Sequence, residues 1–382
     1  MIINNEHKKL NVPNLRFPEF QGEWKKTTIG DIADLYKGTG IFKDQLSDDG
    51  EPCILYGELY TKYKSETIRE VISKTNIDNT KLVRSKANDV IIPCSGETAE
   101  DIATARCVLN GNILLGGDLN IIRLHGYDGA FMSYQLNGRR KYDIAKVAQG
   151  VSVVHLYGEH LKGVKTINPC LEEQKKIAKL LSLLDERIAT QNKIIDKLQS
   201  LIKGLRVRLI QIENGNIVHL GEIAQIYQPQ TISSTELTED GFLVYGANGI
   251  IGKYKQYNHK TEQICITCRG NTCGMVNYTK PMSWITGNAM VINTDEHQNK
   301  VCKRYLYHYL SAYNFNSIIS GSGQPQIVRT PLEQLKVTLP TFLEQKQKAT
   351  FLDKIQGKIE ICNKALNLYL QQKQYLLRQM FI

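Results

Sequence analysis

The sequence predicts an α+β protein of two tandem α/β modules, each followed by a long α-helix, with the two helices pairing as an antiparallel coiled coil. Three observations lead to this fold class: an internal repeat, short β-rich runs within each copy, and a heptad stripe of apolar residues after each copy. With 382 residues and 42% hydrophobic content, the chain is long enough for two cores. The duplication predicts pseudo-twofold symmetry.

The internal repeat is a series of short matching segments that keep their order along the chain. Residues 28–33 match residues 219–224 at an offset of 191, and residues 165–175 match residues 336–346 at an offset of 171. Three more pairs lie between these ends, namely 55–57 with 244–246, 90–96 with 264–270, and 117–122 with 287–292. The first copy is therefore about 20 residues longer than the second (191 − 171).

Each copy mixes strand-like and helix-like segments. Residues 89–92, 113–115 and 120–124 are rich in β-branched and apolar side chains and are punctuated by glycines, which indicates a sheet with tight turns. Residues 130–147 and 301–313 have the pattern of helices. The strand order does not follow from the sequence.

A long helix is predicted after Pro169 and again after Pro340, because apolar residues recur there at alternating four- and three-residue spacing. About 40 residues give a helix roughly 60 Å long. Gln191 and Lys373 interrupt the stripes. The helix seam comprises Leu181, Leu184, Ile188, Ile195, Leu198, Ile202, Leu352, Ile355, Ile359 and Leu366. We expect the two stripes to pack against each other; the alternative is that each helix folds back on its own module.

The overall charge favours a polyanionic partner. The net charge is +10 and the pI is near 9.0, and basic side chains attract phosphates and release their counterions on binding. No segment approaches the roughly 18 apolar residues of a membrane span, and residues 1–6 lack the pattern of a secretory signal. We expect a soluble, cytoplasmic protein that does not bind membranes.

The cysteines suggest reduced thiols rather than disulfides or a metal site. There are nine, an odd number, without regular spacing. Cys265 and Cys268 form a C-x2-C pair with Cys273 nearby, but no second pair follows, and Cys265 lies in an apolar run. We therefore expect buried free thiols and no metal.

Several catalytic signatures are missing from the sequence. Residues 111–117 have the glycine spacing of a P-loop, but Gly117 stands where a lysine is required. Residues 168–170 lack the second proline and the aromatic ring with which amino-methyltransferases hold an extruded base. Pro18 and Glu19, followed by residues 23–25, only superficially resemble a nuclease triad. We therefore expect no catalytic residues.

Candidate DNA-reading residues lie in loop-like segments rich in glycine, tyrosine, amides and basic side chains. Arginine and lysine hydrogen-bond guanine, whereas asparagine and glutamine hydrogen-bond adenine. For each of these positions, the alternative is an exposed turn or a helix cap. The candidates are Lys37, Thr39, Tyr56, Tyr60, Ser95, Thr98, Gln149 and Ser152 in the first copy, and Tyr227, Gln228, Gln230, Tyr245, Asn248, Arg269, Asn271, Thr272, Gln324, Gln326 and Arg329 in the second. Corresponding positions differ between the copies, as two readers of different sequences require.

Over essentially its whole length the chain resembles the specificity subunit of type I restriction-modification enzymes. The resemblance rests on residues 13–20 with Trp24, residues 29–33, and the loop around residues 323–326. It rests also on the paired helix starts at residues 171–178 and 342–349. These motifs are individually moderate, but together and in duplicate they are specific.

The resemblance implies the roles of the parts. Residues 1–165 are the first target-recognition domain, 166–213 the central long helix, 214–340 the second target-recognition domain and 341–382 the C-terminal long helix. Each domain is expected to read one half of a bipartite, asymmetric site in double-stranded DNA. The helices are expected to set the spacer and to dock two methyltransferase subunits, which translocase/endonuclease subunits join. S-adenosylmethionine, ATP and Mg2+ would belong to those partners, with no cofactor in this chain.

Two other classes of function remain open at this point. One is a DNA methyltransferase or endonuclease that acts alone, which would incorporate methyl groups or cut DNA without partners. The other is a coiled-coil scaffold that binds only proteins, which would not bind DNA of any sequence at low salt.

Overall fold

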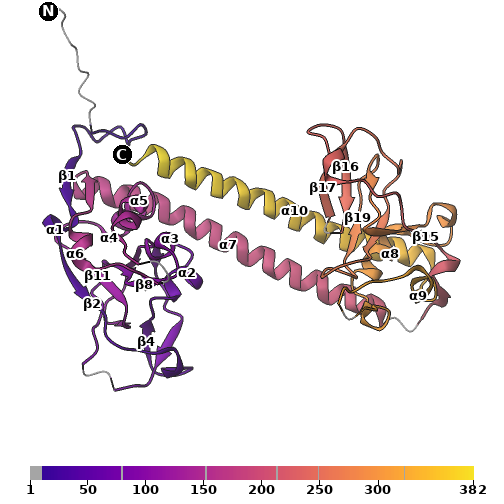
Figure 1. The fold of residues 1–382 in the computed structure, drawn as a ribbon, viewed down its shortest axis with the longest axis horizontal. Coiled ribbons are helices and arrows are strands. Elements are labelled where there is room, and N and C mark those ends of the chain that lie inside the picture. Colours follow the sequence, from indigo (N-terminus) through magenta and orange to yellow (C-terminus); the bar gives the residue numbers. More distant parts are fainter. Residues whose placement is uncertain (1–10, 79–80, 151–152, 212–213, 248, 322) are drawn as a thin grey trace, which may run out of the picture. The chain divides into compact units, whose positions relative to one another are not determined.

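The computed structural model describes residues 11–78, 81–150, 153–211, 214–247, 249–321 and 323–382. The chain divides into two compact units. Unit 1 comprises the chain up to Gln191 together with Ala365–Ile382, and unit 2 comprises Asn192–Lys364. We call the part of unit 1 before the first long helix the first module, and the part of unit 2 between the two long helices the second module (Figure 1).

The first module is built on two sheets. The larger has the order β2-β11-β7-β9-β5, in which neighbours are antiparallel except β9 and β5. Its strands are β2 (Ala33–Lys37), β5 (Thr67–Ile68), β7 (Asp89–Pro93), β9 (Arg106–Val108) and β11 (Leu119–Leu124). The smaller has the order β10-β4-β6-β3, with β3 (Leu46–Ser47), β4 (Glu51–Ile54), β6 (Ser73–Thr75) and β10 (Leu114–Leu115). The buried runs predicted at 89–92 and 120–124 thus form the centre of the larger sheet.

Short helices alternate with the strands of the first module along the chain. They are α1 (Ile29–Ile32), η1 (Lys43–Gln45), α2 (Glu58–Thr61), α3 (Ala99–Ile102), α4 (Gly129–Asn137), α5 (Lys141–Val147) and α6 (Gly158–Lys162). The single helix predicted over 130–147 is therefore wrong. It is two helices, because the chain leaves the α conformation at Gly138, whose amide donates to the carbonyl of Tyr134 and closes α4.

The second module repeats this topology. Its larger sheet has the order β15-β21-β18-β19, matching β2-β11-β7-β9, with β15 (Gln225–Tyr227), β18 (Ile264–Thr267), β19 (Val276–Tyr278) and β21 (Ala289–Asn293). Its smaller sheet has the order β17-β16-β20, with β16 (Phe242–Gly246), β17 (Gly249–Tyr254) and β20 (Trp284–Ile285). The pairs β4–β10 and β16–β20 are both parallel. The strand order that the sequence left open is thus the same in both copies.

The helices of the second module are α8 (Lys303–Leu310) and α9 (Arg329–Glu333), with 3-10 helices η2 (Leu220–Glu222), η3 (Ser234–Glu236), η4 (Asp295–His297) and η5 (Phe315–Ser317). Each module also begins and ends in one antiparallel strand pair. These pairs are β1 (Lys25–Thr28) with β13 (Lys165–Asn168), and β14 (Asn216–His219) with β22 (Lys336–Leu339). Each pair brings the start of a module next to the point where its long helix leaves.

Most of the extra length of the first module lies between residues 57 and 90. Across this segment the offset between the copies falls from 189 at Leu55/Val244 to 174 at Val90/Ile264. The additional residues form α2 and β5, and β5 extends the larger sheet beyond β9. We call residues 58–73 the insertion.

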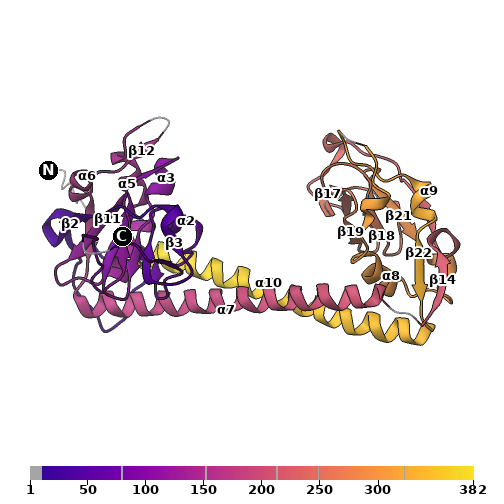
Figure 2. The same ribbon diagram turned by 90° about the horizontal axis from the view of Figure 1, so that it is seen from below.

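The two long helices are α7 (Leu171–Ile210) and α10 (Phe342–Gln379). Their 40 and 38 residues make them roughly 60 and 57 Å long. Each helix begins in one unit and ends in the other, so that each unit contains the first part of one helix and the last part of its partner. Figure 2 shows these parts side by side within each unit.

In unit 1 the two helices run in opposite directions. Asp185 of α7 contacts Lys373 of α10, and Arg187 and Thr190, further along α7, line one pocket with Tyr369, which precedes Lys373 on α10. The contacted residue number on α10 thus falls as the number on α7 rises, which is the antiparallel arrangement. Six predicted seam residues are buried, namely Leu181, Leu184, Ile195, Ile202, Leu352 and Ile359, and the other four, Ile188, Leu198, Ile355 and Leu366, are half-buried.

The start of each long helix is attached to its own module by a glutamine. The amide nitrogens of Gln174 and Gln345, both about 1% exposed, donate to the carbonyls of Pro169 and Pro340. Their amide oxygens accept from the backbone nitrogens of Asp128 and Cys302 in the modules. The repeated Glu-Gln-Lys motif therefore fixes how each helix leaves its module.

Candidate nucleic-acid interface

Two loops of the second module that the sequence suggested separately are joined in the structure. Arg269 follows β18 and forms an antiparallel bridge with Gln326, and Gln326 forms a second bridge with Ser320. The amide of Gly270 donates to the carbonyl of Pro325 at 3.0 Å, and the amide of Ile327 donates to the carbonyl of Cys268 at 3.0 Å. Ser320 and Gln326 thus form a paired hairpin base beside the segment that leaves β18.

The first module has the same arrangement with different side chains. Ser95 of β8 (Ser95–Gly96) lies opposite His155 of β12 (Val154–His155), and His155 bridges to Gln149. The amide of Leu156 donates to the carbonyl of Cys94 at 2.7 Å, as that of Ile327 does to Cys268. The duplication therefore extends to individual backbone hydrogen bonds.

A glycine with positive φ shapes the hairpin in each module. Gly150 and Gly321 have φ of +124° and +91°, which side chains rarely tolerate. A Cβ atom at these positions would also collide with the carbonyl oxygens of Val153 and Gln324. We call the described residues of the two hairpins, together with Ser95 of β8 and Arg269 just after β18, the strand–hairpin sites.

Five candidates of the second module belong to its strand–hairpin site or lie next to it. Arg269, Asn271 and Gln324 are exposed, Gln326 is half-buried, and the neighbouring Thr272 is also half-buried. No described residue forms a hydrogen bond or an ion pair with the side chain of Arg269. This arginine is therefore available to a ligand.

Four further candidates of the second module have partners within the protein. Tyr245 is buried, at 5% exposed, and its hydroxyl accepts from the amide of Lys280, so its prediction as an accessible base reader does not fit the structure. Tyr227 is half-buried and pairs with His259, with 2.8 Å between its hydroxyl and Nε2. Gln228 donates to the carbonyl of Gly287, and Nε of Arg329 lies 2.6 Å from Oε1 of Glu333. Gln230 is exposed.

In the first module the candidates are spread over several elements. Gln149 is exposed and Ser95 is half-buried in the strand–hairpin site. Thr98 caps α3 by accepting from the amide of Asp101, which fits the alternative of a helix cap, and Thr39 is half-buried and accepts from the amide of Val83. Lys37 is exposed, and Tyr56 and Tyr60 are half-buried near α2. Ser152 and Asn248 lie outside the described residues.

The sequence-based candidates omitted two exposed aromatic residues of the first module. His155, directly opposite Ser95, stacks on Tyr157 with ring centroids 6.2 Å apart, and Tyr157 is 54% exposed. The signal was present in the repeat, because His155 is 171 residues before Gln326, the same offset as between the helix starts.

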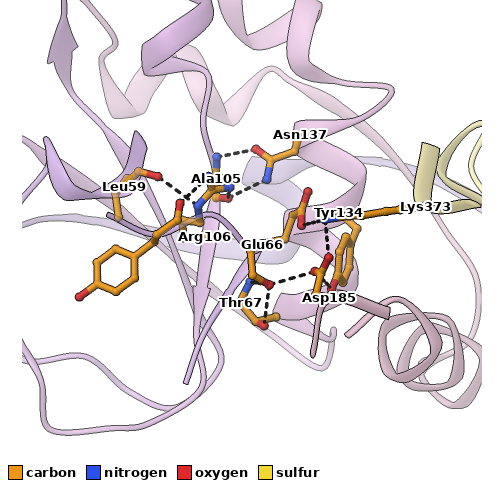
Figure 3. Close-up of polar contacts among 11 residues, drawn as sticks. Leu59, Glu66, Thr67, Ala105, Arg106, Tyr134, Asn137, Asp185 and Lys373 are labelled. Carbon is orange, nitrogen blue, oxygen red and sulfur yellow. Dashed lines mark hydrogen bonds and ion pairs between the residues drawn. The ribbon is translucent and has the colours of Figure 1, made fainter. Parts of the chain in front are cut away.

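A buried charge cluster joins the first module to both long helices (Figure 3). Nζ of Lys373 on α10 lies 2.5 Å from Oε2 of Glu66 in the insertion and 2.6 Å from Oδ1 of Asp185 on α7. Asp185 also accepts from the hydroxyls of Tyr134 and Ser65. Burial alone would lower the pKa of Lys373, but the two carboxylates hold that pKa above its ordinary value. Lys373, which interrupts the heptad stripe, thus links α10 by ion pairs to the insertion and to α7.

Arg106 contacts the insertion and also interacts electrostatically with Glu66 of the cluster. It is buried, and it donates to the carbonyls of Leu59 and Tyr63 in the insertion and of Ala105 in its own chain segment. Burial lowers the pKa of this guanidinium. Glu66 is affected in the opposite sense, since burial raises its pKa and Lys373 only partly offsets this.

The cysteines of the second module are packing residues in the structure. Cys265 and Cys268 are buried, Cys273 is half-buried, and all three are free thiols. Burial raises the pKa of Cys265 to about 12. Among the described residues, no group of three or more histidine, cysteine or acidic side chains is placed to hold a metal ion. In the same residues, no helix has the length and apolar character needed to span a membrane.

Comparisons with known proteins agree with this duplicated architecture. The family model of the type I restriction modification DNA specificity domain matches twice, at residues 21–200 and 213–370. The specificity subunit of type I restriction enzyme MjaVIII from Methanocaldococcus jannaschii is 25% identical over 397 residues, covering 92% of this chain and 89% of its own length. The EcoprrI specificity subunit of Escherichia coli is 32% identical over 140 residues, covering 35% of this chain and 34% of its own length.

Solved structures show the same fold. The type I restriction-modification S subunit from M. genitalium superimposes with a TM-score of 0.74 at 19% identity, covering 97% of this chain and 99% of that one. Together the two family matches span most of the sequence. The chain therefore belongs to the family of type I restriction-modification DNA specificity proteins, of whose characteristic domain it contains two copies.

Proposed function

We propose that each module reads one half of a bipartite, asymmetric target in double-stranded DNA. The observation that carries this proposal is the strand–hairpin site, which occurs twice with the same backbone hydrogen bonds but different side chains. A shared scaffold with different exposed groups suits two readers of different sequences. The basic composition, with a net charge of +10, supports a phosphate-rich ligand.

In this proposal the chain acts by recognition and has no chemistry of its own. Two methyltransferase subunits dock on the long helices, and translocase/endonuclease subunits join the complex. S-adenosylmethionine, ATP and Mg2+ then belong to those partners. A solved structure similar to this chain, with a TM-score of 0.53, comes from work on complex assembly of the type I restriction-modification system, which supports assembly with partner subunits.

The long helices set the spacing between the two half-sites in this proposal. Inserting one heptad after Gln191 in α7 and one after Lys364 in α10 would lengthen both helices by about 10.5 Å without changing the face of either seam. At 3.4 Å per base pair, this corresponds to a spacer about three base pairs longer.

Methylation mapping in a host that carries the partner subunits tests this directly. We expect both half-site sequences to stay the same and the spacer between them to grow. A mapped motif with its original spacer would contradict the role of the helices. Incubation of the purified chain with DNA and labelled S-adenosylmethionine tests the alternative of a stand-alone methyltransferase. That alternative predicts that labelled methyl groups appear in the DNA, whereas our proposal predicts none.

A further inference from the structure

The strand–hairpin site of each module places three side chains on one face of the backbone. Residues directly opposite each other in adjacent strands point to the same side. In the second module these are Arg269, Gln326 and Ser320, and in the first module Ser95, His155 and Gln149. We call each set of three a reading face.

The backbone hydrogen bonds define how close these side chains are. The bonds flanking Arg269 and Gln326 run from Gly270 to Pro325 and from Ile327 to Cys268, so Arg269 and Gln326 form a non-hydrogen-bonded pair. In such a pair the Cα atoms are only about 4.5 Å apart and the side chains are close neighbours. Ser320 and Gln326 exchange two backbone bonds with each other, which makes Ser320 the outer member of the face.

The chemistry of the second reading face matches two adjacent purines. A guanidinium reads O6 and N7 of guanine with two hydrogen bonds, and a glutamine amide reads N6 and N7 of adenine. Successive bases are 3.4 Å apart, which is within reach of two side chains whose Cα atoms are about 4.5 Å apart. The major groove also admits a pair of adjacent extended segments, such as those joined by the bridge between Ser320 and Gln326.

We propose that Arg269 and Gln326 determine specificity for a guanine next to an adenine in the half-site read by the second module. The first reading face carries Ser95 where the second carries Arg269, so the bidentate arginine contact proposed for guanine is absent from the first face. This inference rests on the proposed function, because it assigns bases to a site already taken to read DNA.

The test is a double-mutant cycle between Arg269 and each base pair of the half-site. The complex of the full chain with its methyltransferase subunits is used, after methylation mapping has defined the wild-type target. Binding to the cognate duplex and to duplexes changed at single positions is measured for the wild type, Arg269→Ala and Arg269→Lys. We expect coupling of about five- to 150-fold at one guanine and none elsewhere. The lysine variant retains the charge but also loses this coupling, since it lacks the bidentate geometry.

Lys300→Ala is the control, because Lys300 is an exposed basic residue of the second module that lies outside the strand–hairpin site. We expect no coupling of Lys300 to any base. A second variant, Ser95→Arg, should add a guanine preference to the half-site read by the first module. The half-site read by the second module should stay unchanged.

Two failures are distinguishable. A wild-type complex without a bipartite target overturns the proposed function. If the wild-type target is bipartite and Arg269→Ala weakens cognate and substituted duplexes equally, the proposed function stands and the assignment of Arg269 is overturned, because the residue then contacts only phosphate.

Discussion

Replacing Lys373 with methionine should destabilise unit 1 by about 3 kcal/mol at pH 7. The side chains of Glu66 and Asp185 are only 11% and 8% exposed, so the substitution leaves two buried carboxylates without their ammonium group. Removing one partner of a buried ion pair costs about 3 to 5 kcal/mol. We expect the lower end of this range, because Asp185 keeps its hydrogen bonds from Tyr134 and Ser65.

The loss should shrink as the pH falls from 8 to 5. Lys373 lowers the pKa of Glu66, which burial raises, so the pKa of Glu66 rises further in the variant. A carboxyl whose pKa is raised in the folded state destabilises the fold as the pH increases from the unfolded value of about 4.3 through the folded value. At acidic pH the variant protonates Glu66 and recovers part of its stability, whereas Lys373 of the wild type stays protonated over this range because its pKa is raised.

Trp24 provides a local probe for this measurement. The chain has two tryptophans, and Trp24 lies in the core of unit 1, where its ring packs edge-on against Phe131 at 5.8 Å. In a Trp284→Phe background, urea unfolding followed by fluorescence reports on unit 1. Lys179→Met, a change of an exposed lysine on α7, is the control and should alter stability by less than about 0.5 kcal/mol.

A variant that removes all three charges completes the experiment. Glu66→Met, Asp185→Asn and Lys373→Met together should cost much less than Lys373→Met alone, since no unpaired buried charge remains. A loss below about 1 kcal/mol for Lys373→Met, or a loss that is the same at pH 5 and pH 8, would refute the reasoning.

Three further predictions concern the second module. Gly321→Ala should distort the hairpin at a cost of about 1 to 3 kcal/mol and weaken binding to the specific duplex, while circular dichroism of the chain stays unchanged. Burial lowers the pKa of His308, so its contribution to stability is present above about pH 6.5 and declines as the pH falls. His308→Gln should make the free energy of unfolding, followed by Trp284 fluorescence, less dependent on pH in this range. Tyr245→Phe should cost about 1 kcal/mol of stability through its lost hydrogen bond and leave the mapped DNA target unchanged.

The features that the sequence predicts best are those with a period. The repeat and the heptad stripes follow directly from residue spacing, and the structure has two matching modules and two antiparallel long helices. The break between α4 and α5 was missed, because a single glycine in a helical pattern does not reveal whether the next residues resume the same axis.

The candidate site was predictable only in outline. Loop composition identified the segments around Arg269 and Gln326, but their pairing is a non-local contact that no local pattern encodes. Composition also selected Tyr245, whose burial depends on the β16–β20 sheet and not on its neighbours in sequence. The role of Lys373 was equally hidden, because its partner Glu66 lies 307 residues away in the chain.

The way α10 ends has a consequence for how the protein is made. Met380 and Phe381 belong to the core of unit 1, and the ring of Phe381 stacks on that of Phe131 at 5.1 Å. The ribosome therefore adds 250 further residues (381 − 131) after Phe131 before this core is complete. At about 5 to 20 residues per second, that interval lasts roughly 12 to 50 s. During it, the apolar surface of the nascent first module that Met380 and Phe381 later cover is exposed. Translation speed across the second half of the message thus sets how long this surface is exposed to chaperones and to aggregation.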